Sequence, residues 1–220
     1  MSLTITSEVI KNIWKTIESD LNAQQIVISS EKTLVFKFAW LLNTIDDFKV
    51  YNIDFEKNLF RRDFKDGKFL DLYFEVEIES IKHRVGIEFK FPHKKKSNSG
   101  QTQNIQKIIN DLKKLDSLFQ DDKIDLGVFL CATNEPYYLN IKKKTRKIKG
   151  SFKTFNGKKY LKDTEYPYNE KYKHRLKISN DIIFNWRNTD KISESYFSFL
   201  DPIFIRNDIE NEKMKLNENL

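Results

Sequence analysis

The sequence predicts an α/β protein in which a mixed central β-sheet is flanked by helices. Three observations support this fold class. Residues 69–92 alternate apolar and polar side chains in two runs, which is typical of two strands with one buried face. Residues 104–118 repeat apolar side chains at helical spacing. Residues 122–133 form an almost continuous apolar run, as expected for a central strand that is buried on both faces.

Size, charge and cysteine content restrict the class of protein. The chain has 220 residues, 39% of them hydrophobic, which suits one domain with a packed core. Its net charge of +7 favours a polyanionic partner such as nucleic acid, although a lysine-rich composition alone does not require one. The single cysteine, Cys131, cannot form an internal disulfide, so we expect a reduced cytoplasmic protein. No apolar run approaches the roughly 20 residues of a membrane span, so we expect no membrane association.

Two helices are expected before the hairpin. Apolar residues at helical spacing predict a first helix within residues 2–21, with Ser7 as its N-cap. A second helix is predicted over residues 31–43, where Ser29 or Ser30 is in position to cap the first turn. Both helices would place an apolar stripe against the sheet.

The remaining strands follow from shorter patterns. Residues 49–57 predict an edge strand, and residues 65–68 are a turn signal that leads into the hairpin. Residues 178–186 predict a further strand, and residues 194–204 a closing helix or strand. With the hairpin and the strand at 122–133, these segments give a sheet of about five strands.

We expect one domain over residues 1–220, with its core at about 29–140. Residues 141–177 differ in composition, because they hold 14 Lys or Arg residues against three acidic ones. We interpret them as a basic insertion, and residues 178–206 as the C-terminal part of the domain. Aromatic residues within the insertion either stack on nucleic-acid bases or anchor the insertion to the core, which is the commoner role.

The polar face of the hairpin carries the candidate chemistry. If the apolar residues of both runs face the core, Asp71, Glu88 and Lys90 lie together on the opposite face. Carboxylate oxygens are the ligands that Mg²⁺ prefers, and an ammonium beside them can orient or deprotonate a water and offset phosphate charge. Other acid-x-Lys triplets occur, such as Asp111-Leu112-Lys113, but none lies on a strand of this kind. The alternative is a solvated sheet face on which Glu88 and Lys90 are surface partners.

Asp71, followed by Glu88-Phe89-Lys90 at the end of the next strand, resembles the active site of the PD-(D/E)XK nuclease superfamily. Leu70 stands where the family usually has a proline. The predicted order of helix, hairpin, helix and strand is similar to the conserved core of this superfamily. Residues 30–140, and more weakly the C-terminal segments IFNWRN and FSFLDPIFI, resemble one restriction-endonuclease-like group. We therefore expect a restriction-endonuclease-like core.

The resemblance implies a Mg²⁺-dependent DNA endonuclease of the type II restriction kind, acting as a homodimer. It implies one or two Mg²⁺ ions, replaceable by Mn²⁺, held by Asp71, Glu88 and the main-chain carbonyl of Phe89. Lys90 would be catalytic. Glu31 would support the metal or its water, although a first-turn glutamate is also favoured by the helix dipole alone. A cognate methyltransferase encoded nearby would be the partner expected of a restriction enzyme.

Basic and amide residues near the hairpin are expected to bind DNA phosphates, which gives affinity without sequence choice. Three leave the hairpin in a loop, two begin the following helix, and three lie in the basic insertion. They are Lys94, Lys95, Lys96, Gln103, Lys107, Lys142, Lys143 and Lys144. For Gln103 and Lys107, a solvated helix face is an equal alternative.

Three other functions stay open at this point. The first is a structure-selective nuclease of repair, recombination or phage biology. The second is a catalytically silent nucleic-acid-binding protein of the same fold, against which the intact set of Asp71, Glu88 and Lys90 argues. The third is an interaction domain without nuclease activity, which would be favoured if no metal bound.

Overall fold

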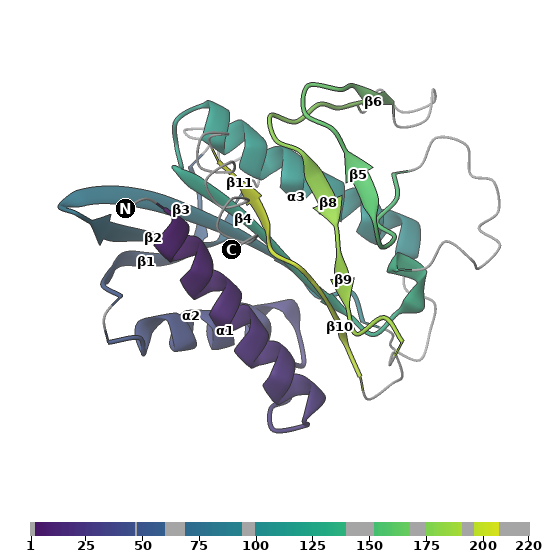
Figure 1. The fold of residues 1–220 in the computed structure, drawn as a ribbon, viewed down its shortest axis with the longest axis horizontal. Coiled ribbons are helices and arrows are strands. Elements are labelled where there is room, and N and C mark those ends of the chain that lie inside the picture. The colour runs from purple at the N-terminus through teal and green to yellow at the C-terminus, as the bar shows by residue number, and fades with distance from the viewer. Residues whose placement is uncertain are drawn as a thin grey trace, which may run out of the picture.

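The computed structural model describes seven segments of the chain, in which the protein is a mixed α/β structure (Figure 1). A central sheet with both parallel and antiparallel strands is flanked by helices, as the sequence predicts. The described segments are residues 3–46, 48–59, 69–93, 100–139, 152–167, 175–190 and 196–206.

Three α-helices and one 3-10 helix lie in the described segments. They are α1 (Thr4–Asn22), α2 (Glu31–Asn43), α3 (Gln101–Gln120) and η1 (Pro136–Tyr138). The predicted bounds of α2 are confirmed, and Ser30 is its N-cap, because its hydroxyl accepts a hydrogen bond from the N–H of Thr33 at 3.2 Å. The prediction that Ser7 caps α1 is wrong. Ser7 is buried one turn into that helix, and its hydroxyl donates back to the carbonyl of Leu3.

The main sheet has seven strands in the order β1-β2-β3-β4-β10-β9, with β11 also paired to β4. It is therefore larger than the expected five, because three short C-terminal strands extend it beyond β4. Their bounds are β1 (Val50–Lys57), β2 (Leu70–Ile78), β3 (Ile81–Lys90), β4 (Leu126–Thr133), β9 (Trp186–Arg187), β10 (Ser198–Leu200) and β11 (Ile203–Ile205).

Two small sheets lie outside the main one. β5 (Lys158–Tyr160) pairs with β8 (Ile182–Phe184), and β6 (Tyr166–Pro167) pairs with β7 (Arg175–Leu176). The single strand expected over residues 178–186 is therefore wrong, since this stretch contains β8 and the start of β9, in different sheets.

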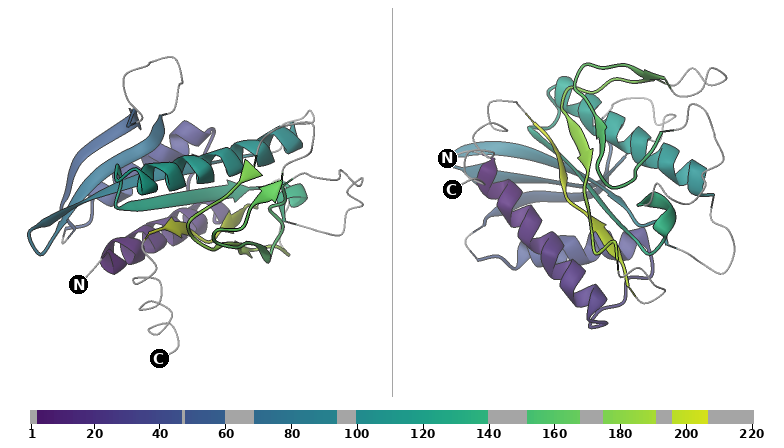
Figure 2. Two further views of the ribbon diagram at one scale, coloured as in Figure 1. Left: turned by 90° about the horizontal axis from the view of Figure 1, so that it is seen from above. Right: turned by 45° about the vertical axis from the view of Figure 1, so that its right-hand side comes forward.

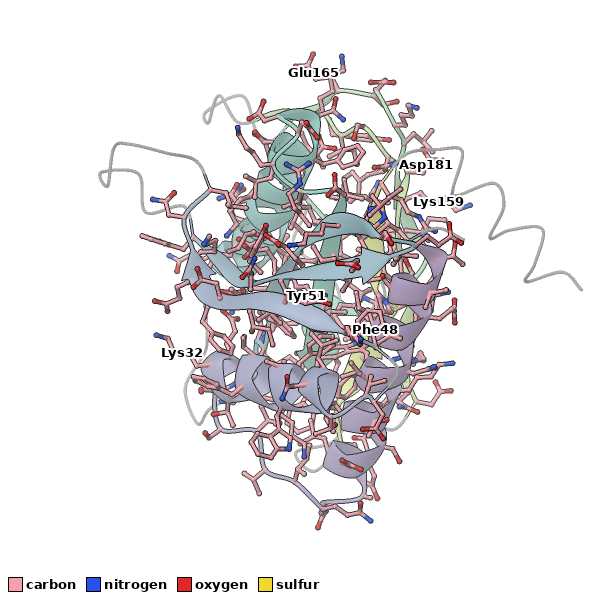
Figure 3. All side chains as sticks on the ribbon, turned by 90° about the vertical axis from the view of Figure 1, so that its left-hand side faces the viewer. Lys32, Phe48, Tyr51, Lys159, Glu165 and Asp181 are labelled. Carbon is pink, nitrogen blue, oxygen red and sulfur yellow. The ribbon has the colours of Figure 1, made fainter. Side chains whose placement is uncertain are left out.

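The chain path places the hairpin at the centre of the main sheet. β1, β2 and β3 are successive antiparallel strands, and α3 then crosses over so that β4 runs parallel to β3. The two residues that join β2 to β3, Glu79 and Ser80, both have positive φ angles, of 52° and 65°. Such a two-residue turn matches the twist of the strands it connects. β1 forms one edge of the sheet beside α2, and Tyr51 on it is exposed (Figure 3).

Two hydrophobic cores cover the two faces of the sheet. α1 and α2 pack on one face and α3 on the other (Figures 2 and 3). The expectation that only one face of β2 is buried is wrong at Tyr73, which is buried in the core under α3. Phe152 and Tyr160 of the predicted basic insertion are buried in the same core, so these two aromatic residues anchor the segment.

None of the helices in the described segments combines the length and the apolar character that crossing a membrane requires.

An ion pair between Arg84 and Asp125 joins β3 to the residue before β4. The main-chain N–H of Arg84 donates to Oδ2 of Asp125 at 2.7 Å, and its guanidinium contacts both carboxylate oxygens, at 3.0 and 2.8 Å. Burial tends to raise the pKa of Asp125, but the hydrogen bonds from Arg84 outweigh burial and hold that pKa below its usual range.

We expect Arg84→Met to lower the free energy of unfolding by about 1 kcal/mol at pH 7, a modest value because both side chains are partly exposed. A carboxyl whose pKa is lowered by folding stabilises the protein above its unfolded pKa, and this contribution is lost as the pH falls. The difference in the free energy of unfolding between wild type and variant should therefore become smaller below about pH 4. Urea unfolding across pH tests this, with Lys82→Met on the same strand as control. A difference that does not change with pH would contradict it.

Candidate functional site

Four of the predicted catalytic residues meet where β2 begins and β3 ends. The antiparallel register of these strands, which confirms the predicted pairing, runs as far as Leu72 opposite Ile87. Asp71 and Glu88 are the next residues on each strand, at the point where the paired register stops. Lys90 is the last residue of β3, and Glu31 is the first residue of α2. β2, β3 and α2 therefore each bring residues at or near one of their ends to the same end of the hairpin.

The ammonium of Lys90 lies at the centre of this group. Its Nζ is 3.1 Å from Oε1 of Glu31, 2.9 Å from Oδ2 of Asp111, and donates to the carbonyl of Phe89 at 2.8 Å. Burial alone would lower the pKa of Lys90. The surrounding carboxylates, Asp111 first and then Glu31, outweigh burial and hold that pKa above its usual range. Lys90 is therefore a cation in this arrangement.

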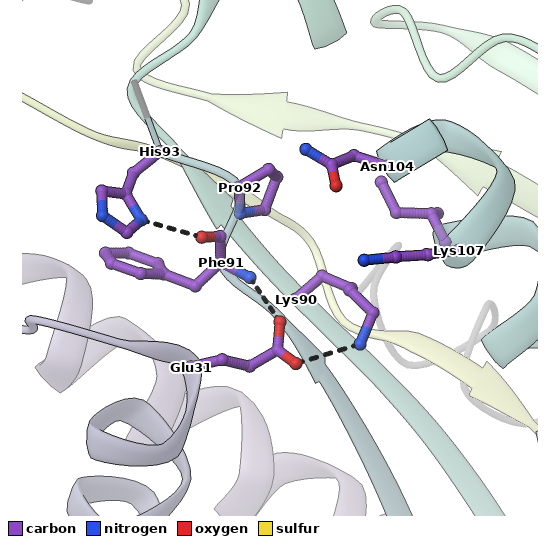
Figure 4. A pocket seen from close by; sticks show the side chains of 8 residues that line it. Glu31, Lys90, Phe91, Pro92, His93, Asn104 and Lys107 are labelled. Carbon is purple, nitrogen blue, oxygen red and sulfur yellow. Dashed lines mark hydrogen bonds and ion pairs between the residues drawn. The ribbon is translucent and has the colours of Figure 1, made fainter. Parts of the chain in front are cut away.

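Glu31 is held by more than the dipole of its helix. Its Oε1 pairs with Lys90, and its Oε2 accepts a hydrogen bond from the main-chain N–H of Phe91 at 3.1 Å (Figure 4). Burial raises the pKa of Glu31, and the charge of Lys90 opposes that rise. About a third of the side chain, 37%, stays exposed. Glu31 is thus a partly exposed carboxylate that is held against the end of β3 by two contacts.

Glu88 is the most deeply buried charged group of the site, with 1% of its side chain exposed. Its neighbour is Lys114, whose Nζ lies 2.6 Å from Oε1 of Glu88 and also donates to the carbonyl of Phe69. Burial raises the pKa of Glu88 well above its usual range, and the charges of Asp111 and Asp71 raise it further, against the effect of Lys114. Glu88 therefore depends on a neighbouring cation to stay ionised.

Asp71 and Phe89 are tied together across the two strands. Oδ2 of Asp71 accepts the main-chain N–H of Phe89 at 2.7 Å. The carbonyl of Phe89, which the resemblance assigns to the metal, accepts the hydrogen bond from Lys90. Both of these groups consequently face the same end of the hairpin as Lys90.

Asp111 and Lys114 belong to the site but are missed by the sequence analysis. Both project from α3, and Asp111 lies between two ammoniums, 2.9 Å from Lys90 and 3.7 Å from Lys114. Burial raises the pKa of Asp111, while Lys90 and Lys114 oppose it. The available signal was the polar row Asn104, Lys107, Asp111 and Lys114, whose spacing of three, four and three residues keeps them on one helix face.

The charges of this cluster do not balance among the side chains. It contains four carboxylates, Glu31, Asp71, Glu88 and Asp111, against the ammoniums of Lys90 and Lys114. Oε1 of Glu88, 2.6 Å from the ammonium of Lys114, and Oδ2 of Asp111, 2.9 Å from the ammonium of Lys90, are buried and have no other partner among the described residues. With all six groups ionised the excess is two negative charges, which one divalent cation would neutralise.

A Mg²⁺ ion fits the chemistry of these donors, which are carboxylate and carbonyl oxygens. Asp71, Glu88 and the carbonyl of Phe89 are the groups that would hold it. Within the described segments, no three His, Cys, Asp or Glu side chains are arranged as a metal-binding group. In this structure the carboxylates are neutralised by lysines instead, with Lys90 2.9 Å from Asp111 and Lys114 2.6 Å from Glu88.

A polar cavity of about 330 Å³ opens beside Lys90, between β3 and α3 (Figure 4). Lys107 and Asn104 reach it from α3, and His93 from the residues after β3. Lys107 is exposed and makes no ion pair with any residue of the described segments. Gln103 is exposed but is not among the residues that line the cavity. Of the two helix residues predicted to contact phosphate, Lys107 is therefore the better placed.

The other predicted phosphate contacts lie outside the described residues. They are Lys94, Lys95, Lys96, Lys142, Lys143 and Lys144.

Comparison with known proteins gives no family for this chain. No protein-family model matches the sequence, and no curated protein or solved structure matches it. The PD-(D/E)XK resemblance therefore rests on Asp71, Glu88, Phe89 and Lys90 and on the order of the elements. Function has to be inferred from the geometry and chemistry of the site.

We expect Lys114→Met to lower the free energy of unfolding by about 3 kcal/mol at pH 8, because it leaves the buried Glu88 carboxylate without its cation. An unpaired Glu88 would hold its proton more tightly in the folded chain than in the unfolded chain. The difference in the free energy of unfolding between wild type and Lys114→Met should therefore become smaller as the pH falls toward the ordinary glutamate pKa of about 4.3.

The double variant Glu88→Gln, Lys114→Met removes both charges and should recover at least half of this loss. Urea unfolding of the wild type, both single variants and the double variant gives the coupling energy. Losses that simply add would show that the two side chains are not coupled.

Proposed function

We propose that the protein is a Mg²⁺-dependent nuclease that hydrolyses phosphodiester bonds in DNA. The observation that carries the proposal is the convergence of Glu31, Asp71, Glu88 and Lys90 at one end of the hairpin, where carboxylates and ammoniums lie in contact. These are the residues of the PD-(D/E)XK resemblance. The described order of helix, hairpin, helix and parallel strand is also the order which that resemblance implies, so the proposed core is restriction-endonuclease-like.

Asp71, Glu88 and the Phe89 carbonyl would hold one or two Mg²⁺ ions, and Mn²⁺ would substitute because it accepts the same oxygen ligands. When bound, the metal supplies charge relief on the phosphate and a more acidic water. Support comes from the buried oxygens of Glu88 and Asp111, whose only partners among the described residues are lysine ammoniums. With all six charged groups of the cluster ionised, the excess of two negative charges gives a further electrostatic reason to bind a divalent cation.

The side chains of the chain itself have separate roles. Lys90 acts as a cation, because its raised pKa keeps it protonated; it orients the attacking water and offsets charge on the phosphate. Glu31 is the partly exposed carboxylate whose pKa is raised by burial, which suits a group that accepts a proton from water. Asp111 positions Lys90 from the opposite side. The ammonium of Lys107 would hold a neighbouring phosphate in the polar cavity.

Within this function, a type II restriction-like enzyme is the first proposal. It carries the expectations of a homodimer and of a methyltransferase encoded nearby, and it requires that a methylated site resist cleavage. A structure-selective nuclease is the second candidate. It is favoured by two exposed aromatic rings, Phe36 and Phe55, in a cavity that also reaches Glu31 and Asp71.

Glu88→Gln and Asp71→Asn should each reduce Mg²⁺-dependent DNA cleavage by at least about 100-fold, because each removes a negative oxygen from the site. DNA binding should persist, since neither change removes a positive charge. Cleavage is followed on supercoiled plasmid DNA with Mg²⁺, with Mn²⁺ and with EDTA, which should abolish it. Glu77→Gln, an exposed acid on the same strand as Asp71, is the matched control. Wild-type turnover in either site variant would remove that residue from the mechanism.

Lys107→Gln should weaken DNA binding and reduce the slope of log K against log salt by about 0.9, because one phosphate contact is lost. The loss should be similar for unrelated sequences, since a phosphate contact does not read bases. Fluorescence anisotropy titrations at several salt concentrations, with Ca²⁺ in place of Mg²⁺, measure both quantities. The control is Lys123→Gln, an exposed lysine beyond the other end of α3. Equal slopes for the two variants would place Lys107 away from the DNA.

A further inference from the structure

Two cavities flank the carboxylate cluster, and they differ in character. The polar cavity beside Lys90 and Lys107 lies on one side. On the other side, a cavity of about 460 Å³ runs between the start of α2 and the edge strand β1, with Phe36 and Phe55 among its lining residues. Glu31 lines both cavities, and Asp71 lines the second. The candidate catalytic carboxylates therefore lie between a cationic cavity and an aromatic one.

The two aromatic rings of the second cavity are not part of a core. Phe36 is 59% exposed and Phe55 is 38% exposed, and their ring centroids are 4.9 Å apart at an angle of 44°. The side of α2 that packs on the sheet carries Leu34, Phe38 and Leu42 instead. Two neighbouring aromatic rings left open to solvent beside charged residues indicate a binding surface.

We propose that this cavity binds an unpaired nucleobase of the DNA strand whose phosphate lies at the carboxylates. The inference rests on the proposed nuclease function and names its substrate class. A base is flat, aromatic and uncharged, so it suits Phe36 and Phe55, whereas its phosphate requires the cations on the other side of Glu31. A continuous strand can fill both cavities, with a phosphate near Lys90 and Lys107 and a base against the rings.

Only a base that has left its duplex can offer its face to a protein side chain. A base that is already unpaired reaches the cavity without the cost of leaving a duplex, so the preferred substrate is DNA with a single-stranded part at the cleavage point, such as a gap, a flap or a loop. This preference favours the structure-selective nuclease over the restriction-like enzyme. Uninterrupted duplex DNA would leave the aromatic cavity empty.

An exposed ion pair at the lining of this cavity can be broken at low cost. Lys32 of α2 and Glu56 of β1, which also line it, form an ion pair at 2.8 Å, and their side chains are 77% and 63% exposed. Figure 3 shows Lys32 projecting outward at the end of α2. Exposed pairs of this kind contribute little to stability. A protein partner is a poorer occupant, because a protein seated on Phe36 and Phe55 would cover Glu31 and Asp71.

The test compares two DNA probes of the same sequence, one fully paired and one with a single-stranded gap of a few nucleotides. Binding is measured by fluorescence anisotropy with Ca²⁺ in place of Mg²⁺. Phe36→Ala and Phe55→Ala should each raise the Kd for the gapped probe about tenfold, the size of one lost base–aromatic stack, and leave the Kd for the duplex unchanged. Phe36→Leu, which keeps an apolar side chain of similar size but removes the ring, should show the same selective loss.

Trp40→Ala is the matched control, because Trp40 lies one turn further along α2, is 71% exposed and is not among the residues lining the cavity. It should bind both probes as the wild type does. Equal affinity of the wild type and the Phe36 variants for gapped DNA would overturn the inference. So would a shift from dimer to monomer in sedimentation of the Phe36 variants, which would assign the rings to a second copy of the chain.

Different results would refute the nuclease function and the base-binding cavity. A wild-type protein that cleaves no DNA with Mg²⁺ and binds neither probe would refute the nuclease function itself. A wild-type protein that cleaves duplex and gapped DNA equally well, with Phe36→Leu unchanged on both, would refute only the base-binding cavity.

Discussion

The ion pairs that Lys90 makes at the end of β3 determine how the candidate site is arranged. Its ammonium contacts Glu31 at the start of α2 and Asp111 in the middle of α3, so one side chain links helices on opposite faces of the sheet. Burying several charges in this way is costly, and apolar residues of similar volume would often stabilise a core as well or better. The cluster is therefore better explained by the chemistry it can perform than by the stability it provides.

Strand pairing and main-chain hydrogen bonds position the carboxylates of the site. β2 and β3 are paired as far as Leu72 and Ile87. This pairing fixes the positions of the adjacent residues, Asp71 on β2 and Glu88 on β3. Asp71 is fixed further by the N–H of Phe89, and Glu31 by the N–H of Phe91. Main-chain donors thus help to orient both carboxylates. Such orientation before substrate binds is what electrostatic catalysis requires.

Much of this arrangement can be predicted from the sequence, because strand alternation and helix capping are local. The period of two along the hairpin places Asp71, Glu88 and Lys90 together, and Ser30 marks the start of α2. Asp111 and Lys114 could not be predicted in the same way, because a polar row on a helix has the same pattern whether it faces water or a buried site. Only the packing of α3 against β3 distinguishes the two, and that depends on residues far apart in the sequence. Tyr73 was misplaced for the same reason.

Lys114 is the cation that neutralises Glu88 in the structure, and under the proposed function it would have to give way to a metal. Its ammonium lies against Glu88, but it also donates to the carbonyl of Phe69 and lies 3.7 Å from Asp111. In the proposed nuclease, a divalent cation held by Glu88 would repel this ammonium, and the carbonyl of Phe69 and the carboxylate of Asp111 would remain as its acceptors. Under that proposal Lys114 would neutralise Glu88 when no metal is bound, and the metal would neutralise it otherwise.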